Sequence, residues 1–143
     1  MHVNPVLASE FENYEHFLTD KTLVFAVSQS GETADVLEAV RIAKGRGSRV
    51  IGITNVLGSS LTMEGDAFLL MHSGPEICVL STKTYTSQVV LMNLLAHALV
   101  NRYEEYVADV KSLYLDIYNL TSRTMREHLE ELAKELVNRS IFI

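Results

Sequence analysis

The sequence predicts an α/β protein, a three-layer α/β/α sandwich around a mostly parallel sheet of about four to five strands. Continuous apolar runs without alternation, typical of strands covered on both faces, recur in the first half of the chain. Helical patterns separate these runs, as in parallel β–α–β units. The chain has 143 residues, 48% hydrophobic and 21% charged, which suits one globular domain with a core of its own. We therefore expect a single domain over residues 1–143.

The expected strands differ in strength. The three strong ones are Leu23–Val27, Arg49–Ile53 and Ala67–Met71. Pro5–Leu7 is weaker and suits an edge strand, because proline is tolerated at the edge of a sheet. Ile141–Ile143 ends the sequence with no helix after it. Such an orphan strand would fill an open edge of its own sheet or of a neighbouring molecule's sheet.

The expected helices lie between and after these strands. Apolar residues recur on one face of a helix over Thr33–Lys44, with Thr33 as its N-cap and Gly45 at its end. A single-turn helix is expected over Ser59–Glu64. Three longer helices are expected near residues 82–101, 104–120 and 122–138.

Composition excludes several classes of function. The formal charge of −6 and the lack of a basic run argue against nucleic-acid binding. The lone cysteine, Cys78, gives no disulfide or CxxC site, and the five histidines lack metal-ligand spacing, so we expect no metal and no cofactor. No run of apolar residues is long enough to span a membrane, and the N-terminal residues are not a signal peptide. We therefore expect no membrane partner and a cytoplasmic location.

The segment from Ser28 to Thr33 (SQSGET) carries the chemistry. It follows the first strong strand, and parallel sheets bind ligands at the carboxyl ends of their strands. Its hydroxyl and amide side chains precede a helix N-terminus, where unpaired N–H groups and the helix dipole attract anions. Gly31 would let the backbone approach a ligand closely. The segment favours binding of a phosphate. It matches neither the Walker A loop nor the GxGxxG motif of nucleotide-binding proteins. The alternative is a serine-rich turn that only caps the helix.

Several segments resemble the SIS (sugar isomerase) domain family, whose members are phosphosugar-binding α/β modules. Ser28–Val36 (SQSGETADV) resembles the signature loop of that family. Further segments resemble its glucosamine-6-phosphate synthase branch, the isomerising glutamine–fructose-6-phosphate aminotransferases. They are Ala8–Phe11 (ASEF), Asn55–Leu61 (NVLGSSL) and Gly74–Gln88 (GPEICVLSTKTYTSQ). Motifs in this order over residues 8–88 are more specific than a serine-rich loop alone.

The resemblance implies a binding site for a hexose 6-phosphate, either fructose 6-phosphate or glucosamine 6-phosphate. No residue matches the catalytic residues of the family's isomerase or glutaminase, so no catalytic residue is assigned and binding alone is expected. Glu76 and Lys83 are expected to be solvated or to fix a loop. For Ser81 the alternative to a ligand contact is helix capping. The residues implied to hold the phosphate are Ser28, Gln29, Ser30 and Thr33, and those implied to contact the sugar are Val79 and Ser81.

The resemblance also bears on what surrounds the chain. It covers the first sugar-binding half of such a synthase without the opening βα unit, and residues 140–143 resemble the start of a second SIS subdomain. The implied partners are a hexose 6-phosphate and either a second copy of the chain, as a homodimer, or the remaining synthase domains, in amino sugar biosynthesis. The alternative function is a stand-alone, non-catalytic SIS sensor or regulator of sugar phosphate. A complete phosphosugar isomerase is disfavoured, because its glutamate and histidine pair is missing.

Overall fold

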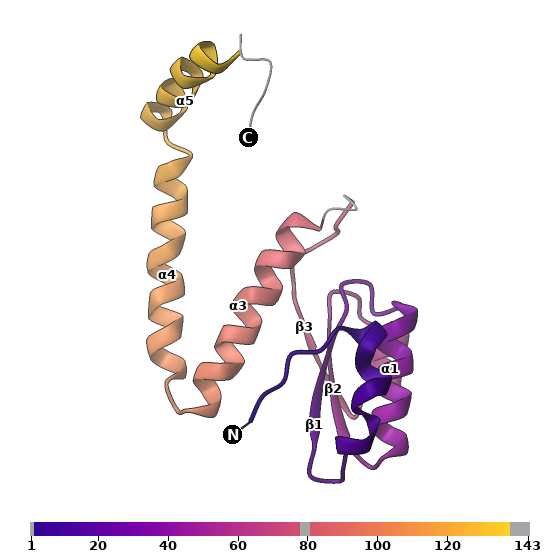
Figure 1. Cartoon of the computed structure of the whole chain (residues 1–143). Helices are drawn as coiled ribbons and strands as arrows, with labels where there is room; N and C mark the ends of the chain where they lie inside the picture. Colours follow the sequence, from indigo (N-terminus) through magenta and orange to yellow (C-terminus); the bar gives the residue numbers. More distant parts are fainter. Residues whose placement is uncertain (1, 78–80, 138–143) are drawn as a thin grey trace. The chain divides into compact units, whose positions relative to one another are not determined.

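The computed structural model describes residues 2–77 and 81–137 (Figure 1). The chain divides into two compact units between residues 91 and 92. That boundary falls within the helix α3, so the strands belong to the first unit. The expectation of one domain over residues 1–143 stays a prediction. The elements in chain order are η1 (Ala8–Phe17), β1 (Leu23–Val27), α1 (Ala34–Gly45), β2 (Arg49–Thr54), α2 (Ser60–Glu64), β3 (Ala67–Leu70), α3 (Thr82–Leu99), α4 (Tyr103–Leu120) and α5 (Arg123–Leu136).

The first unit is built on a parallel sheet with the strand order β1-β2-β3. β1 pairs with β2 from Leu23 opposite Arg49 to Val27 opposite Ile53. β3 extends the sheet on the other side of β2. The helices α1 and α2 form the two crossovers, which confirms the predicted α/β class and the parallel sheet. Because all three strands run the same way, their carboxyl ends lie at one edge of the sheet.

The strand count differs from the expected four to five, since the described residues form three strands. Pro5–Leu7 was expected as an edge strand, and this prediction is wrong. The segment leads instead into η1, a 3₁₀ helix, where Leu7 O accepts a hydrogen bond from Glu10 N at 2.9 Å. Pro5 has no N–H to donate to a strand ladder. The other candidate, Ile141–Ile143, lies outside the described residues.

The core of the first unit lies between the sheet and α1. The apolar face predicted for that helix is confirmed, and Val40 and Ala43 on it are completely buried. They meet Ala26 of β1 and Val50 of β2, and η1 packs against the same cluster on the same face of the sheet (Figure 1). Burying such side chains stabilises a fold by about 1.5–3 kcal/mol each for the larger ones. The strand β1 and the helix α1, which the Ser28–Thr33 loop connects, are therefore held together by this buried cluster.

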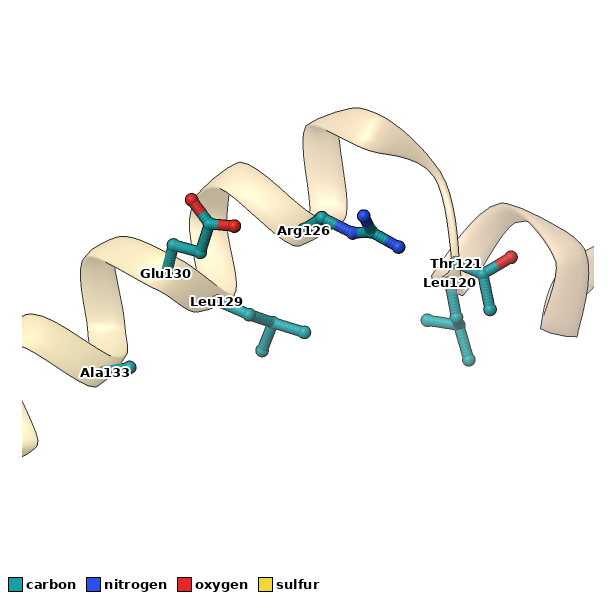
Figure 2. Close-up of a pocket in the computed structure, with 6 residues that line it drawn as sticks. All are labelled: Leu120, Thr121, Arg126, Leu129, Glu130 and Ala133. Atoms are coloured by element: carbon teal, nitrogen blue, oxygen red, sulfur yellow. The ribbon is translucent and has the colours of Figure 1, made fainter.

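The second unit contains the end of α3 and the helices α4 and α5. Ser122 caps α5, with its Oγ accepting from Met125 N at 3.4 Å. α5 is amphipathic, and its leucines at 129, 132 and 136 keep between 40% and 52% of their surface exposed. A shallow hollow lies where α4 joins α5 (Figure 2). The residues that line it are Leu120, Thr121, Arg126, Leu129, Glu130 and Ala133. None of the helices within the described ranges combines the length and apolarity needed to cross a bilayer.

Substitution of Gly52 should test how α2 sits on the sheet. A Cβ at Gly52 would lie 2.9 Å from Leu61 Cγ and 3.2 Å from Leu61 O. Overpacking of this kind costs about 1–3 kcal/mol, so Gly52→Ala should lower the free energy of unfolding in urea by that amount. Gly45→Ala is the control, because an added Cβ there meets nothing within 4 Å at the end of α1. Equal stability of the two variants would contradict this packing.

Candidate functional site

The loop from Ser28 to Thr33 connects β1 to α1 and is organised by its own hydroxyl groups. Ser28 Oγ accepts from Gly31 N at 3.0 Å and lies 2.7 Å from Thr33 Oγ1. Ser30 Oγ accepts from Glu32 N at 3.1 Å. Ser28 is buried, whereas Thr33 is exposed. If Ser28 donates within the Ser28–Thr33 pair, the Thr33 proton is left for an acceptor on the solvent side.

The N-terminus of α1 is open towards this loop. Thr33 occupies the N-cap position, as predicted, and its carbonyl accepts from Leu37 N at 3.0 Å. Its side chain does not cap the helix, because Oγ1 lies against Ser28 instead. The first amides of an α-helix lack intrahelical acceptors, and the helix dipole places partial positive charge there. The arrangement suits an anion at the start of α1.

Gly31 is held in a position that no other residue could take without strain. Its φ is +70°, and a Cβ there would lie 2.1 Å from Ser59 Oγ and 2.9 Å from Thr54 Oγ1. Its carbonyl accepts from Leu61 N at 3.0 Å. The Ser59 hydroxyl below it is buried and has no hydrogen-bond partner among the described residues. Gly31 therefore lies against the turn before α2, and the close approach of its backbone to a ligand stays a prediction.

Glu32 joins the same loop to α2. Its Oε1 accepts from Ser60 N and its Oε2 accepts from Ser60 Oγ, both at 2.7 Å. These two hydrogen bonds favour the ionised carboxylate and hold the pKa of Glu32 below its ordinary value of 4.5. This contact was not predicted from the sequence, since the two residues are 28 positions apart. The available signal was a second serine-rich turn, residues 55–61, after the neighbouring strand.

Asn55 links the ends of the other two strands to this loop. Gln29 O accepts from Asn55 N at 3.0 Å and from Thr54 Oγ1 at 3.2 Å. The Asn55 side chain donates to Gly74 O at 2.7 Å and accepts from Ser73 N at 3.0 Å. The segments that follow β1, β2 and β3 therefore form one hydrogen-bonded network at the carboxyl edge of the sheet.

The structure brings the four residues predicted to hold phosphate into one loop, with Gln29 and Ser30 half-buried. Ser81 is half-buried just before α3 and has a positive φ of 51°, and its carbonyl accepts from Tyr85 N at 3.0 Å. Val79 lies outside the described residues. The phosphate and sugar roles of these residues stay predictions.

Glu76 fixes a loop, which was one of the two roles expected for it. Its Oε2 accepts from Thr84 N at 3.2 Å and from Thr84 Oγ1 at 3.1 Å, and Thr84 is completely buried. This carboxylate therefore anchors the first turn of α3. Within residues 2–77 and 81–137, no group of three His, Cys, Asp or Glu side chains is placed to hold a metal ion.

The first unit is thus an α/β domain with a parallel sheet, and the N-terminus of α1 lies at the carboxyl edge of that sheet without a side-chain cap. Residues 1–98 match the family model described as SIS domain, and the chain belongs to this family. The chain is 39% identical over 138 residues to glutamine–fructose-6-phosphate aminotransferase [isomerizing] of Fusobacterium nucleatum. That match covers 91% of this chain and 22% of the relative, so the chain spans less than a quarter of that enzyme's length.

Solved structures give the same result. The C-terminal domain of glucosamine-fructose-6-phosphate aminotransferase from Francisella tularensis superposes with a TM-score of 0.60 at 30% identity, over 82% of this chain and 35% of that one. The Vibrio vulnificus NanR protein complexed with ManNAc-6P superposes with a TM-score of 0.59 at 24% identity, over 81% of this chain and 44% of that one. At 24% identity, the similarity to the NanR protein shows only a shared fold.

Gly31→Ala should destabilise the first unit more than the same change at another glycine of positive φ. Backbone strain of this type costs about 1–3 kcal/mol, and the added Cβ would also collide with Ser59. Gly58→Ala is the matched control, since Gly58 has a φ of +81° but an added Cβ meets nothing within 4 Å. Urea unfolding should show a larger loss for Gly31→Ala. Equal losses would contradict the close approach to Ser59.

The contribution of Glu32 to stability should depend on pH. Because its pKa is lowered in the folded chain, its contribution is fully present above the ordinary value of 4.5 and is lost as the pH falls through the lower folded value. The difference in unfolding free energy between the wild-type chain and Glu32→Ala should therefore be largest near neutral pH and narrow at pH values below 4.5. Urea unfolding across this range measures it. A difference that is the same at all pH values would show that the ionised carboxylate is not involved.

Proposed function

We propose that this chain is the phosphosugar-binding part of a glucosamine-6-phosphate synthase and is not catalytic alone. In this proposal Ser28, Gln29, Ser30 and Thr33 hold the phosphate of fructose 6-phosphate or glucosamine 6-phosphate. The observation that carries the proposal is the open N-terminus of α1, which lacks a side-chain cap and is bordered by a hydroxyl-rich loop.

The loop supplies the donors that a phosphate requires. Ser30 Oγ accepts one hydrogen bond from Glu32 N, and its own proton remains available to a ligand. The first amides of α1 add donors, and so does the Thr33 hydroxyl when Ser28 donates within the Ser28–Thr33 pair. Because the chain carries a formal charge of −6, its overall field repels a phosphate, and these local donors have to hold it.

The similarity to the aminotransferase of Fusobacterium nucleatum supports the synthase, because it extends over 91% of this chain at 39% identity. In the proposed enzyme the phosphate anchors the end of the sugar remote from the reacting carbons, and such binding energy positions the reacting groups. Val79 and Ser81 would contact the sugar. The catalytic groups would come from the remaining domains of the synthase, with which this chain would associate. The alternative partner is a second copy of the chain in a homodimer, which would bring no catalytic group.

Isothermal titration of the purified chain with glucosamine 6-phosphate tests the proposal. We expect a Kd between about 1 μM and 1 mM, which is about −8 to −4 kcal/mol, and no binding of unphosphorylated glucosamine. Ser30→Ala and Thr33→Val should each weaken binding about tenfold, since each removes a hydrogen bond to a charged group. Ser112→Ala is the control, because Ser112 is an exposed serine on α4. No binding, or equal binding of the two sugars, would overturn the proposal.

The purified chain should not form glucosamine 6-phosphate from fructose 6-phosphate with either glutamine or ammonia. The reason is that the chain supplies binding groups without the catalytic residues of the family. A coupled assay for glucosamine 6-phosphate measures this directly. Turnover above the enzyme-free rate would show that the chain is catalytic alone.

A further inference from the structure

We propose that Glu32 is a positioning residue for the phosphate site: it fixes the Ser28–Thr33 loop to α2 without touching the ligand. This inference rests on the proposed function. It assigns a role to a residue that lies between the predicted phosphate ligands Ser30 and Thr33 and is not one of them.

The contact is a two-point attachment between consecutive residues. Glu32 accepts from both the amide and the hydroxyl of Ser60 at 2.7 Å. The preceding residue, Gly31, accepts from Leu61 N at 3.0 Å. Gly31 and Glu32 of the loop thus accept hydrogen bonds from Leu61 and Ser60 in the first turn of α2. A single bond would allow the loop to pivot, whereas this attachment fixes both its distance and its orientation.

Glu32 also orients the hydroxyl predicted to bind phosphate. Its amide donates to Ser30 Oγ at 3.1 Å, and the next residue, Thr33, occupies the N-cap position of α1. Because the Glu32 amide occupies one lone pair of Ser30 Oγ, the position of the Glu32 backbone determines the direction in which the Ser30 hydroxyl can donate its proton. If the Glu32 side chain no longer bound Ser60, the hydroxyls of Ser30 and Thr33 would be free to move away from the amides of α1.

The charge of Glu32 cannot be what favours a phosphate. A carboxylate beside a dianion repels it, so any gain in affinity from this residue has to come from geometry. A variant that keeps the contacts with Ser60 but lacks the charge can therefore distinguish the effect of position from the effect of charge. In Glu32→Gln the amide oxygen can still accept from Ser60 N, and the amide nitrogen can donate to Ser60 Oγ. That variant therefore keeps both contacts and loses the charge.

The experiment is titration of the full chain with glucosamine 6-phosphate, with urea unfolding of each variant to verify folding. Glu32→Ala should weaken binding about tenfold, since it removes two charge-assisted hydrogen bonds that hold the loop. Glu32→Gln should stay within about threefold of the wild-type chain. Glu38→Ala is the matched control, because Glu38 is an exposed carboxylate of α1 whose ion-pair partner is Arg41.

A double-mutant cycle provides the second measurement. Ser60→Ala removes the hydroxyl donor but keeps the amide, and it should weaken binding about threefold. If the two residues act through one contact, Glu32→Ala with Ser60→Ala should bind no more weakly than Glu32→Ala alone. Should Glu32→Ala not fold, Ser60→Ala and Glu32→Gln still decide the matter, because the first has to lose affinity and the second has to keep it.

The outcomes separate this inference from the proposed function. A wild-type chain that does not bind the sugar phosphate overturns the proposed function and the inference with it. A wild-type chain that binds, with Glu32→Ala or Ser60→Ala binding equally well, overturns the inference alone. A loss in Glu32→Gln as large as in Glu32→Ala would also overturn it, since the charge rather than the position would then matter.

Discussion

The close approach of the loop after β1 to the first turn of α2 is the contact on which the candidate site depends. Gly31 lies so near Ser59 that it leaves no room for a side chain, and its carbonyl and the Glu32 carboxylate take up the first donors of α2. The loop is therefore held by a neighbouring element as well as by its own serine and threonine hydroxyls. The Gly31 carbonyl and the Glu32 carboxylate are directed to α2, so neither of them caps the first amides of α1.

α2 is short, yet the packing around it fixes its position. Leu61 is completely buried and lies against Gly52 of β2, where even a methyl group would collide with it. At the other end of the helix, Arg41 of α1 pairs with Glu64 at 2.8 Å and Lys44 donates to Glu64 O at 2.7 Å. Exposed ion pairs contribute little stability alone, so burial of Leu61 contributes most of the stability of the α2 packing. The contacts of Glu64 with Arg41 and Lys44 determine the orientation of the helix. A helix fixed in this way can in turn hold the loop.

Much of this fold could be predicted from the sequence, because strand and helix periods are local. The predicted strands Leu23–Val27 and Arg49–Ile53 agree with the structure to within one residue, and the family of the chain follows from its motifs. The contacts that shape the site could not be predicted, since they join residues far apart in the chain. Glu32 and Ser60 are one example, at 28 positions apart. The contact of Thr33 with Ser28 is local, but it was missed because an N-cap residue does not show in the sequence whether its hydroxyl bonds its own helix or another group. η1 was missed because a 3₁₀ segment has no strong apolar period, and the expected edge strand Pro5–Leu7 is an irregular segment that leads into it.

In the proposed function the loop presents the open start of α1 to a sugar phosphate. The most direct test is an ¹H–¹⁵N correlation spectrum of the labelled chain, recorded during titration with glucosamine 6-phosphate and with glucosamine. We expect the phosphorylated sugar to shift the amide signals of Ser30, Glu32 and residues 34–36, while glucosamine leaves them in place. Shifts confined to α4 and α5, or equal shifts with both sugars, would contradict it.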